Sequence, residues 1–203
     1  MDRLASDEFD GVGTENTDAT ARLVAHVANL GHARIGMIFG LPGLQTTEER
    51  LAGYFNELER RGLPLDRELV RTGRSNADDA ERAVYQLLAV RHRPTALVVA
   101  NSHMAIGALR ALRKRGVEIP RDMAFVSFDD FEWADFVRPR LTTMAQQIDK
   151  IGEEAARLMQ ARLANPARRT QEVRQKPAFM HRDSCGCHQS TDRSAADTTP
   201  TAS

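Results

Sequence analysis

The chain has 203 residues, of which 41% are hydrophobic and 5% aromatic, a composition ordinary for a globular α/β protein. Its 28 Lys and Arg residues balance its 28 Asp and Glu residues, so no net positive field draws the whole chain to nucleic acid or to an anionic membrane. No apolar run approaches the ~20 residues that cross a bilayer, and the acidic start MDRLASDEFDG is unlike a signal peptide. We therefore expect a cytoplasmic protein.

The two ends of the chain have the composition of unfolded segments. Residues 1–12 predict a disordered leader, and residues 183–203, rich in Ser, Thr, Ala and Asp, predict a disordered tail. Residues 13–182 carry the periodic apolar patterns of a folded domain.

Helical and strand patterns alternate along residues 13–182. In chain order the predicted elements are a helix over 17–30, a strand over 34–39, a helix over 47–61, a strand over 68–72, a helix over 77–91, a strand over 95–100, a helix over 103–115, a strand over 123–128, a helix over 147–163 and a final strand over 171–180. Thr46 and Glu49 have the spacing of a capping box at the second helix, and Gly31 and Gly62 follow helices as C-terminal caps. The alternation predicts an α/β fold with a parallel sheet and helical crossovers.

Polar residues stand where predicted strands end. Asn101 follows the strand over 95–100, Asp129 follows the strand over 123–128, and Arg50 lies beyond the loop after the first strand. The carboxyl ends of parallel strands form the crevice in which open α/β sheets bind ligands. A guanidinium, a carboxylate and an amide together suit a small polar ligand such as a sugar. Each residue also has a structural alternative: Asn101 and Asp129 as caps, and Arg50 in a surface ion pair.

Five strings occur in a fixed order and cover nearly all of residues 13–182. They are TENTDATARLVAHV (14–27), LGHARIGMIFG (30–40), ERLAGYFNELERRGL (49–63), PTALVVANSHMAIGALRALRKRGVEIPRDMAFVSFDD (94–130) and RPRLTTMAQQIDKIGEEAARLM (138–159). Their order and spacing resemble the effector-binding domain of the lactose and galactose repressor (LacI/GalR) family of bacterial transcription regulators. The resemblance implies a type I periplasmic-binding-protein-like fold, a parallel Rossmann-like sheet flanked by helices, with effector held between two lobes.

The resemblance also implies a set of effector-binding residues. Carried over by position, these are Arg50, Asn101 and Asp129, with Thr46, Ser75 and Gln146 as further candidates. Ser75 stands where many sugar-binding relatives have an aromatic ring, and Ser102 replaces the acid that usually follows the strand-end Asn. These departures leave the ligand class open between a sugar and a related metabolite. No cofactor and no metal are expected.

In the family's order, a helix-turn-helix, a hinge helix and most of the N-terminal lobe precede this region. This chain then holds mainly the C-terminal lobe, with the helix over 147–163 and the last strand returning to the N-terminal lobe. We expect Ile148, Ile151 and Leu158 to be exposed or to cover another surface. We also expect this chain alone to bind no operator and to bind effector weakly, since regulators of this kind act by closing a cleft between two lobes.

A homodimer is implied by the resemblance. The helix over 103–115, with Met104 and Ala108, and the segment after FDD, with Phe131 and Trp133, are the predicted interface. The alternative is that the aromatic side chains pack beneath their own loop.

Three other interpretations were weighed. His181, Cys185, Cys187 and His188 offer zinc ligands, but Cys-x-Cys is not the usual two-residue knuckle spacing. An enzyme is not favoured, because no phosphate-binding glycine pattern and no complete set of catalytic side chains is found. A sugar-binding protein of a transporter or sensor is the remaining alternative.

Overall fold

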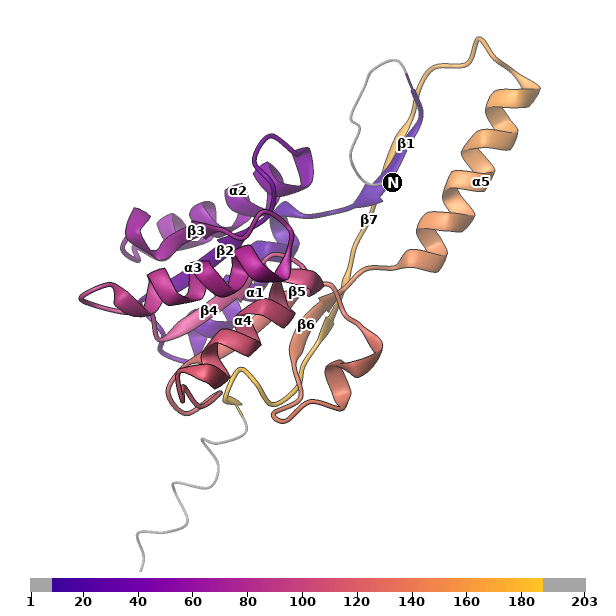
Figure 1. Cartoon of the computed structure of the whole chain (residues 1–203). Coiled ribbons are helices and arrows are strands. Elements are labelled where there is room, and N and C mark those ends of the chain that lie inside the picture. Colours follow the sequence, from indigo (N-terminus) through magenta and orange to yellow (C-terminus); the bar gives the residue numbers. More distant parts are fainter. Residues whose placement is uncertain (1–8, 188–203) are drawn as a thin grey trace, which may run out of the picture.

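The computed structural model describes residues 9–187 (Figure 1). Between residues 17 and 128 the helices and strands alternate as the sequence predicts, whereas the single strand predicted over 171–180 is two strands in different sheets. The helices are α1 (Thr17–Asn29), α2 (Gln45–Arg60), α3 (Ala77–Ala89), α4 (Ser102–Lys114) and α5 (Ile148–Ala164), with short 3-10 turns at Arg67–Leu69 and Glu132–Asp135. The strands are β1 (Gly11–Thr14), β2 (Ile35–Phe39), β3 (Val70–Thr72), β4 (Ala96–Val99), β5 (Ala124–Phe128), β6 (Thr142–Ala145), β7 (Glu172–Gln175) and β8 (Ala178–Met180).

The main body is built on a six-stranded sheet in the order β3-β2-β4-β5-β6-β8. The first five strands run parallel, and β8 pairs antiparallel with β6. Every residue of β4 and β5 is buried, as expected of strands covered by helices on both faces. The order reverses direction at β2, because β3 lies on one side of it and β4 on the other. This places a topological switch point between β2 and β4.

Two helix pairs cover this sheet. α1 packs against α2, and α3 packs against α4. Both contacts are close because a glycine faces the neighbouring backbone: a Cβ atom on Gly107 would lie 1.9 Å from the Ala77 carbonyl oxygen, and one on Gly53 would lie 2.1 Å from that of Thr17. The buried core lies between the sheet and these four helices.

A smaller second body projects from the main one (Figure 1). It consists of β1 paired parallel with β7, and of α5, which packs beside β1 and β7. Three chain segments join the two bodies: the one between β1 and α1, the one between β6 and α5, and the one between β7 and β8. The parallel β1–β7 pair brings together segments from opposite ends of the chain.

The structure corrects several expectations from the sequence. Gly11 and Val12 belong to β1 and not to a leader, while Ser184 and Cys185 are buried and belong to the fold; residues 1–8 and 188–203 lie outside the described residues. β6 is not among the predicted strands, because its four residues are too few to show a clear strand period.

The capping box predicted at α2 is also wrong. The helix begins at Gln45 with Leu44 as its N-cap, and no side chain caps it. Glu49 instead accepts hydrogen bonds from the side chains of Asn16, Gln45 and Arg174.

α5 meets the expectation of an exposed apolar face only in part. Ile148 and Leu163 are exposed by 73% and 74%, whereas Leu158 is buried. Leu158 is covered because β1 and β7 lie against that face of the helix. None of the helices in the described part of the chain is long and apolar enough to cross a membrane.

Met104 and Ala108 do not lie at the surface. Both are fully buried, because this face of α4 packs against α3 and the sheet. They therefore cannot contact a second subunit directly, which corrects that part of the predicted interface. The exposed side of α4 carries Ile106 and Arg110 instead.

Candidate functional site at the carboxyl ends of the strands

A polar pocket of about 370 Å³ lies at the carboxyl ends of β2, β3, β4 and β5. Its lining residues are Gly40, Leu44, Thr46, Thr47, Arg50, Ser75, Ala100, Asn101, Ser102, His103 and Asp129. The pocket therefore sits beside the switch point of the sheet, where open α/β sheets bind their ligands. Five of the six effector-binding candidates line it; the sixth, Gln146, contacts a lining residue.

Arg50 is the most buried charged group of the pocket, with 7% exposure. It lies on α2, which follows β2, and its guanidinium reaches across to β4, where Nη1 donates to the Ala100 carbonyl at 2.5 Å. Nε donates to Asn16 Oδ1 at 2.8 Å, and the guanidinium carbon lies 3.7 Å from the centre of the Phe128 ring. These contacts hold the cation in one orientation without neutralising it.

Asp129 lies opposite Arg50, with 4.0 Å between its Oδ1 and Arg50 Nη2. The two groups attract each other electrostatically at this distance, but they form no direct hydrogen bond. Asp129 has φ of 68°, a left-handed conformation in which Asp is tolerated better than most residues. Its Oδ1 accepts a 2.6 Å hydrogen bond from Gln146 Nε2. Asp129 is thus held at the pocket by both its backbone and its neighbour.

Polar partners of the pocket lie on two of the three segments that join the two bodies, and a further partner lies in β7. Gln146, between β6 and α5, accepts from Thr14 Oγ1 at the end of β1 at 2.5 Å. Asn16, just after β1, connects Arg50 to Glu49, and Glu49 pairs with Arg174 of β7 at 3.1 Å. The pocket is therefore linked through hydrogen bonds to two of the three connections, and to β7, which leads into the third.

The remaining candidates play more local roles. Asn101 caps α4, because its Oδ1 accepts from the Met104 amide at 2.9 Å. Asn101 also lines the pocket. The two predicted roles of this residue, helix cap and ligand contact, are therefore compatible. Ser75, like Asp129, has positive φ, and its Oγ accepts from the Leu41 amide at 3.2 Å. Thr46 lines the pocket from the first turn of α2.

Several lining residues were not among the predicted ones, notably Gly40, Thr47 and His103. Gly40 follows β2 directly, much as Asn101 follows β4, so the strand-end argument could have found it. A Cβ atom there would lie 2.8 Å from Ser75 Oγ and 2.9 Å from Thr47 Oγ1. Among residues 9–187 no Phe, Tyr or Trp lines the pocket, which agrees with the departure noted at Ser75.

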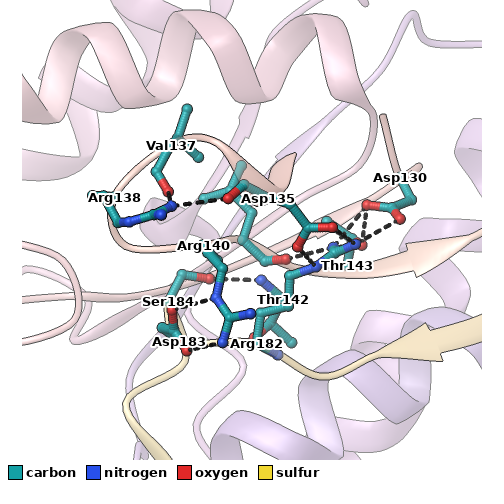
Figure 2. A network of polar contacts seen from close by, with 11 residues as sticks. Asp130, Asp135, Val137, Arg138, Arg140, Thr142, Thr143, Arg182, Asp183 and Ser184 are labelled. Atoms are coloured by element: carbon teal, nitrogen blue, oxygen red, sulfur yellow. Dashed lines mark hydrogen bonds and ion pairs between the residues drawn. The ribbon is translucent and has the colours of Figure 1, made fainter. Parts of the chain in front are cut away.

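Asp130, next to Asp129, points into a separate network (Figure 2). It accepts two hydrogen bonds from Arg182, at 2.8 and 2.9 Å, and one from Thr143 Oγ1 at 2.8 Å. Arg182 is 7% exposed and also pairs with Asp135 through its Nε at 2.6 Å. This network joins the loop after β5 to the segment after β8.

The aromatic segment after Asp130 is divided between the core and the surface. Phe131 packs partly against the core, and its ring centre lies 4.0 Å from that of Trp133. Phe136, in contrast, is exposed by 80%.

The fold and the pocket define a small-molecule-binding α/β domain. Residues 24–185 match the family model described as periplasmic binding protein-like domain. Because this match covers most of the chain, the chain belongs to the periplasmic binding protein-like domain family.

The relatives are regulators of the LacI type. The chain is 28% identical over 171 residues to the probable HTH-type transcriptional repressor ExuR of Bacillus subtilis, covering 84% of this chain and 51% of that protein. It is 33% identical over 152 residues to the repressor CytR of Escherichia coli K12, covering 75% and 45%. Among solved structures, the transcriptional regulator CelR in complex with cellobiose superposes with a TM-score of 0.83 at 28% identity, covering 89% of this chain and 55% of that one.

The chain spans about half the length of the curated relatives it matches. The matched region is their effector-binding domain, and the resemblance to the LacI/GalR family is confirmed. The comparisons favour a regulator over a sugar-binding protein of a transporter.

Proposed function

We propose that this chain is the effector-sensing part of a LacI/GalR-type transcriptional regulator. Its pocket binds a small polar ligand, a sugar or a related metabolite, and thereby controls operator binding by the helix-turn-helix of the same regulator. The observation that carries this proposal is the opposition of Arg50 and Asp129 across the pocket at 4.0 Å. A ligand hydroxyl that accepts from the guanidinium and donates to the carboxylate can bridge the two. No catalytic role is proposed for either residue.

The ligand that fits is rich in hydroxyl groups. The lining offers the side chains of Thr46, Thr47, Ser75 and Ser102 besides the amide of Asn101, and no aromatic ring for stacking on an apolar sugar face. Alternating donors and acceptors of this kind match vicinal hydroxyls better than a flat apolar ring system.

The links from the pocket to the connecting segments support a role in signalling. A ligand that draws Asp129 or Arg50 toward itself changes the partners of Gln146 and Asn16, which lie on two of the three connections. The relative population of two orientations of the bodies then depends on the ligand, as differential binding requires. The homodimer stays part of this proposal, with Phe131, Trp133 and Phe136 as the candidate contacts.

A thermal-shift screen of sugars, nucleosides and organic acids against the 203-residue chain tests the proposal, with each ligand at high concentration because weak binding is expected of this chain alone. Each ligand that raises the melting temperature is then titrated by calorimetry into the parent chain, into Asp129→Asn and into Asp78→Asn. Asp78 is a matched control, because its side chain is 80% exposed and lies outside the pocket. We expect Asp129→Asn to weaken binding about 10-fold or more, the effect of losing a hydrogen bond to a charged group. If Asp129→Asn bound every ligand as tightly as the control Asp78→Asn, the proposed pocket would be contradicted.

A further inference from the structure

Two histidines and two cysteines converge where α1 meets the C-terminal segment. His26 lies in the last turn of α1, His181 follows β8 directly, and Cys185 and Cys187 lie in the turn beyond it. Their nitrogen and sulfur ligand atoms all lie within 4.8 Å of one another. The sequence shows three of these residues close together, but only the fold brings His26 to them.

The separations suit one small tetrahedral ion. Bonds of about 2.3 Å to sulfur and 2.0–2.1 Å to nitrogen place the donor atoms of a tetrahedral Zn²⁺ site about 3.3–3.8 Å apart. Here the two sulfur atoms are 3.2 Å apart, and His181 Nε2 is 2.7 Å from Cys187 Sγ. Cys185 and Cys187 are reduced, as ligation of a metal ion requires. Movements of about one ångström therefore open the cluster to the separations that zinc requires.

Burial and hydrogen bonding also favour an ion. Cys185 is 1% exposed, and Nε2 of His26 is buried without a hydrogen-bond partner in the described part of the chain. A buried polar atom without a partner is costly and calls for an explanation. Two thiolates neutralise the charge of a divalent cation, so a site of two cysteines and two histidines buries no net charge.

The backbone around the cluster is fixed independently of any ion. Ser184 Oγ donates to the Phe125 carbonyl at 2.6 Å and accepts from the Thr142 amide at 2.9 Å. The Phe125 amide in turn donates to the Ser184 carbonyl at 2.8 Å. Cys185, the next residue, is thus attached to β5 and β6, while α1 holds His26 against the same region. The backbone that carries Cys185 is therefore held in place without the ion, and only side chains have to adjust to bind it.

We propose that His26, His181, Cys185 and Cys187 bind one Zn²⁺ ion in a closed structural site. Soft thiolate and imidazole ligands favour Zn²⁺ over Mg²⁺ or Ca²⁺. The ion fastens the segment after β8 to α1 and stabilises the main body, since binding free energy of such a site adds to folding free energy. None of the four residues lines the pocket. The two sites are therefore separable by experiment.

The zinc content of the 203-residue chain, purified under reducing conditions, tests this proposal. We expect one equivalent of zinc, and Co²⁺ in its place should give the visible bands of a tetrahedral ion with thiolate charge transfer. Cys187→Ser and His181→Asn are the variants of choice, because Cys187 is only half-buried and His181 is exposed. Each should weaken metal affinity by about 10- to 100-fold or more. His92→Asn, an exposed histidine outside the cluster, should keep the full metal content.

A second measurement separates loss of the ion from loss of the fold. Chelation should lower the melting temperature of the parent chain and of His92→Asn, and should leave that of folded Cys187→Ser unchanged. Absence of stoichiometric zinc together with failure to take up tetrahedral Co²⁺ would overturn the proposal. So would equal zinc content in the parent and in both ligand variants, or a Cys185–Cys187 disulfide in the chain as isolated.

Discussion

Asp130 accepts two hydrogen bonds from the guanidinium of Arg182, while Asp129, its neighbour in the chain, faces the pocket. The positive φ of Asp129 turns the two carboxylates into different environments. One therefore anchors the loop after β5 to the C-terminal segment, and the other is available to a ligand.

The Arg182–Asp130 pair makes a stability prediction. Arg182→Met should lower the free energy of unfolding by about 3 kcal/mol, because removing one partner leaves a partly buried carboxylate without its cation. Arg140→Ala breaks a more exposed pair with Asp183 and should lower stability much less than Arg182→Met does. Urea denaturation of both variants measures the difference, and similar losses would mean that the Arg182 network contributes no more than a surface ion pair.

The same pair makes stability depend on pH. Burial alone would raise the pKa of Asp130, but hydrogen bonds from Arg182 and Thr143 outweigh it and hold the pKa below its ordinary value. The folded state binds the Asp130 proton less readily than the unfolded state does. The ionised carboxylate therefore contributes to the free energy of unfolding above about pH 4, and this contribution is lost as the pH falls through the lower folded-state pKa. Asp130→Asn should therefore lose less stability than the parent when the pH is lowered from about 5 to about 3. Urea denaturation measures this loss as the free energy of unfolding of each protein relative to that of the same protein at about pH 5. An equal loss would place the acid sensitivity elsewhere, for instance at Glu57, whose pKa is also lowered by hydrogen bonds from Arg60 and Arg61.

The backbone conformation of Asp129 separates binding from stability. Asp129→Gly and Asp129→Ala both remove the carboxylate, so both should lose the ligand-dependent thermal shift. Alanine at φ of 68° carries a steric penalty that glycine lacks. Asp129→Gly should therefore be more stable than Asp129→Ala by about 1 kcal/mol in denaturant titrations. Equal stability of the two variants would show that residue 129 leaves the left-handed region once its hydrogen bond with Gln146 is gone.

Two helical glycines should respond to alanine in opposite directions. Gly107→Ala should destabilise the chain by about 1–3 kcal/mol, because its new methyl group meets the Ala77 carbonyl where α4 crosses α3. Gly152→Ala, on an open face of α5, should stabilise it by about 0.5–1 kcal/mol through helix propensity. Thermal or urea unfolding checks the signs. A gain at both positions would mean that the α3–α4 contact adjusts without strain.

The proposed homodimer makes a prediction about mass in solution. If the segment after Asp130 forms the interface, Phe136→Asp should convert the dimer to a monomer in light scattering, because a charge would be buried against the partner. Leu65→Asp is a matched control, since Leu65 is 53% exposed in a loop between α2 and β3. A dimer that survives Phe136→Asp and Trp133→Asp would exclude this segment as the interface.

Much of the fold was predictable because local patterns carry it. The helix predicted over 77–91 is α3, and Asn76 Oδ1 caps its start by accepting from the Asp79 amide at 2.9 Å. The strands over 95–100 and 123–128 are the central buried strands of the sheet. Since their carboxyl ends must meet at one edge, the sequence also pointed to Arg50, Asn101 and Asp129. The pocket unites these three residues.

What local patterns could not carry was decided by contacts between distant segments. β1 is four residues long and exists only because β7 pairs with it from the other end of the chain. The sequence pattern of the apolar face of α4 is the same whether that face packs against a partner subunit or against α3. Only the tertiary structure places Met104 in the interior. In the sequence, nothing distinguishes His26 from other helix residues. Only the fold places it beside Cys185 and Cys187. The sequence by itself determined the α/β class, the family and the strand ends that form the site, because these depend on periodicity and short-range order. Tertiary structure alone decided which side chains of distant segments meet, because no period or spacing in the chain encodes those contacts.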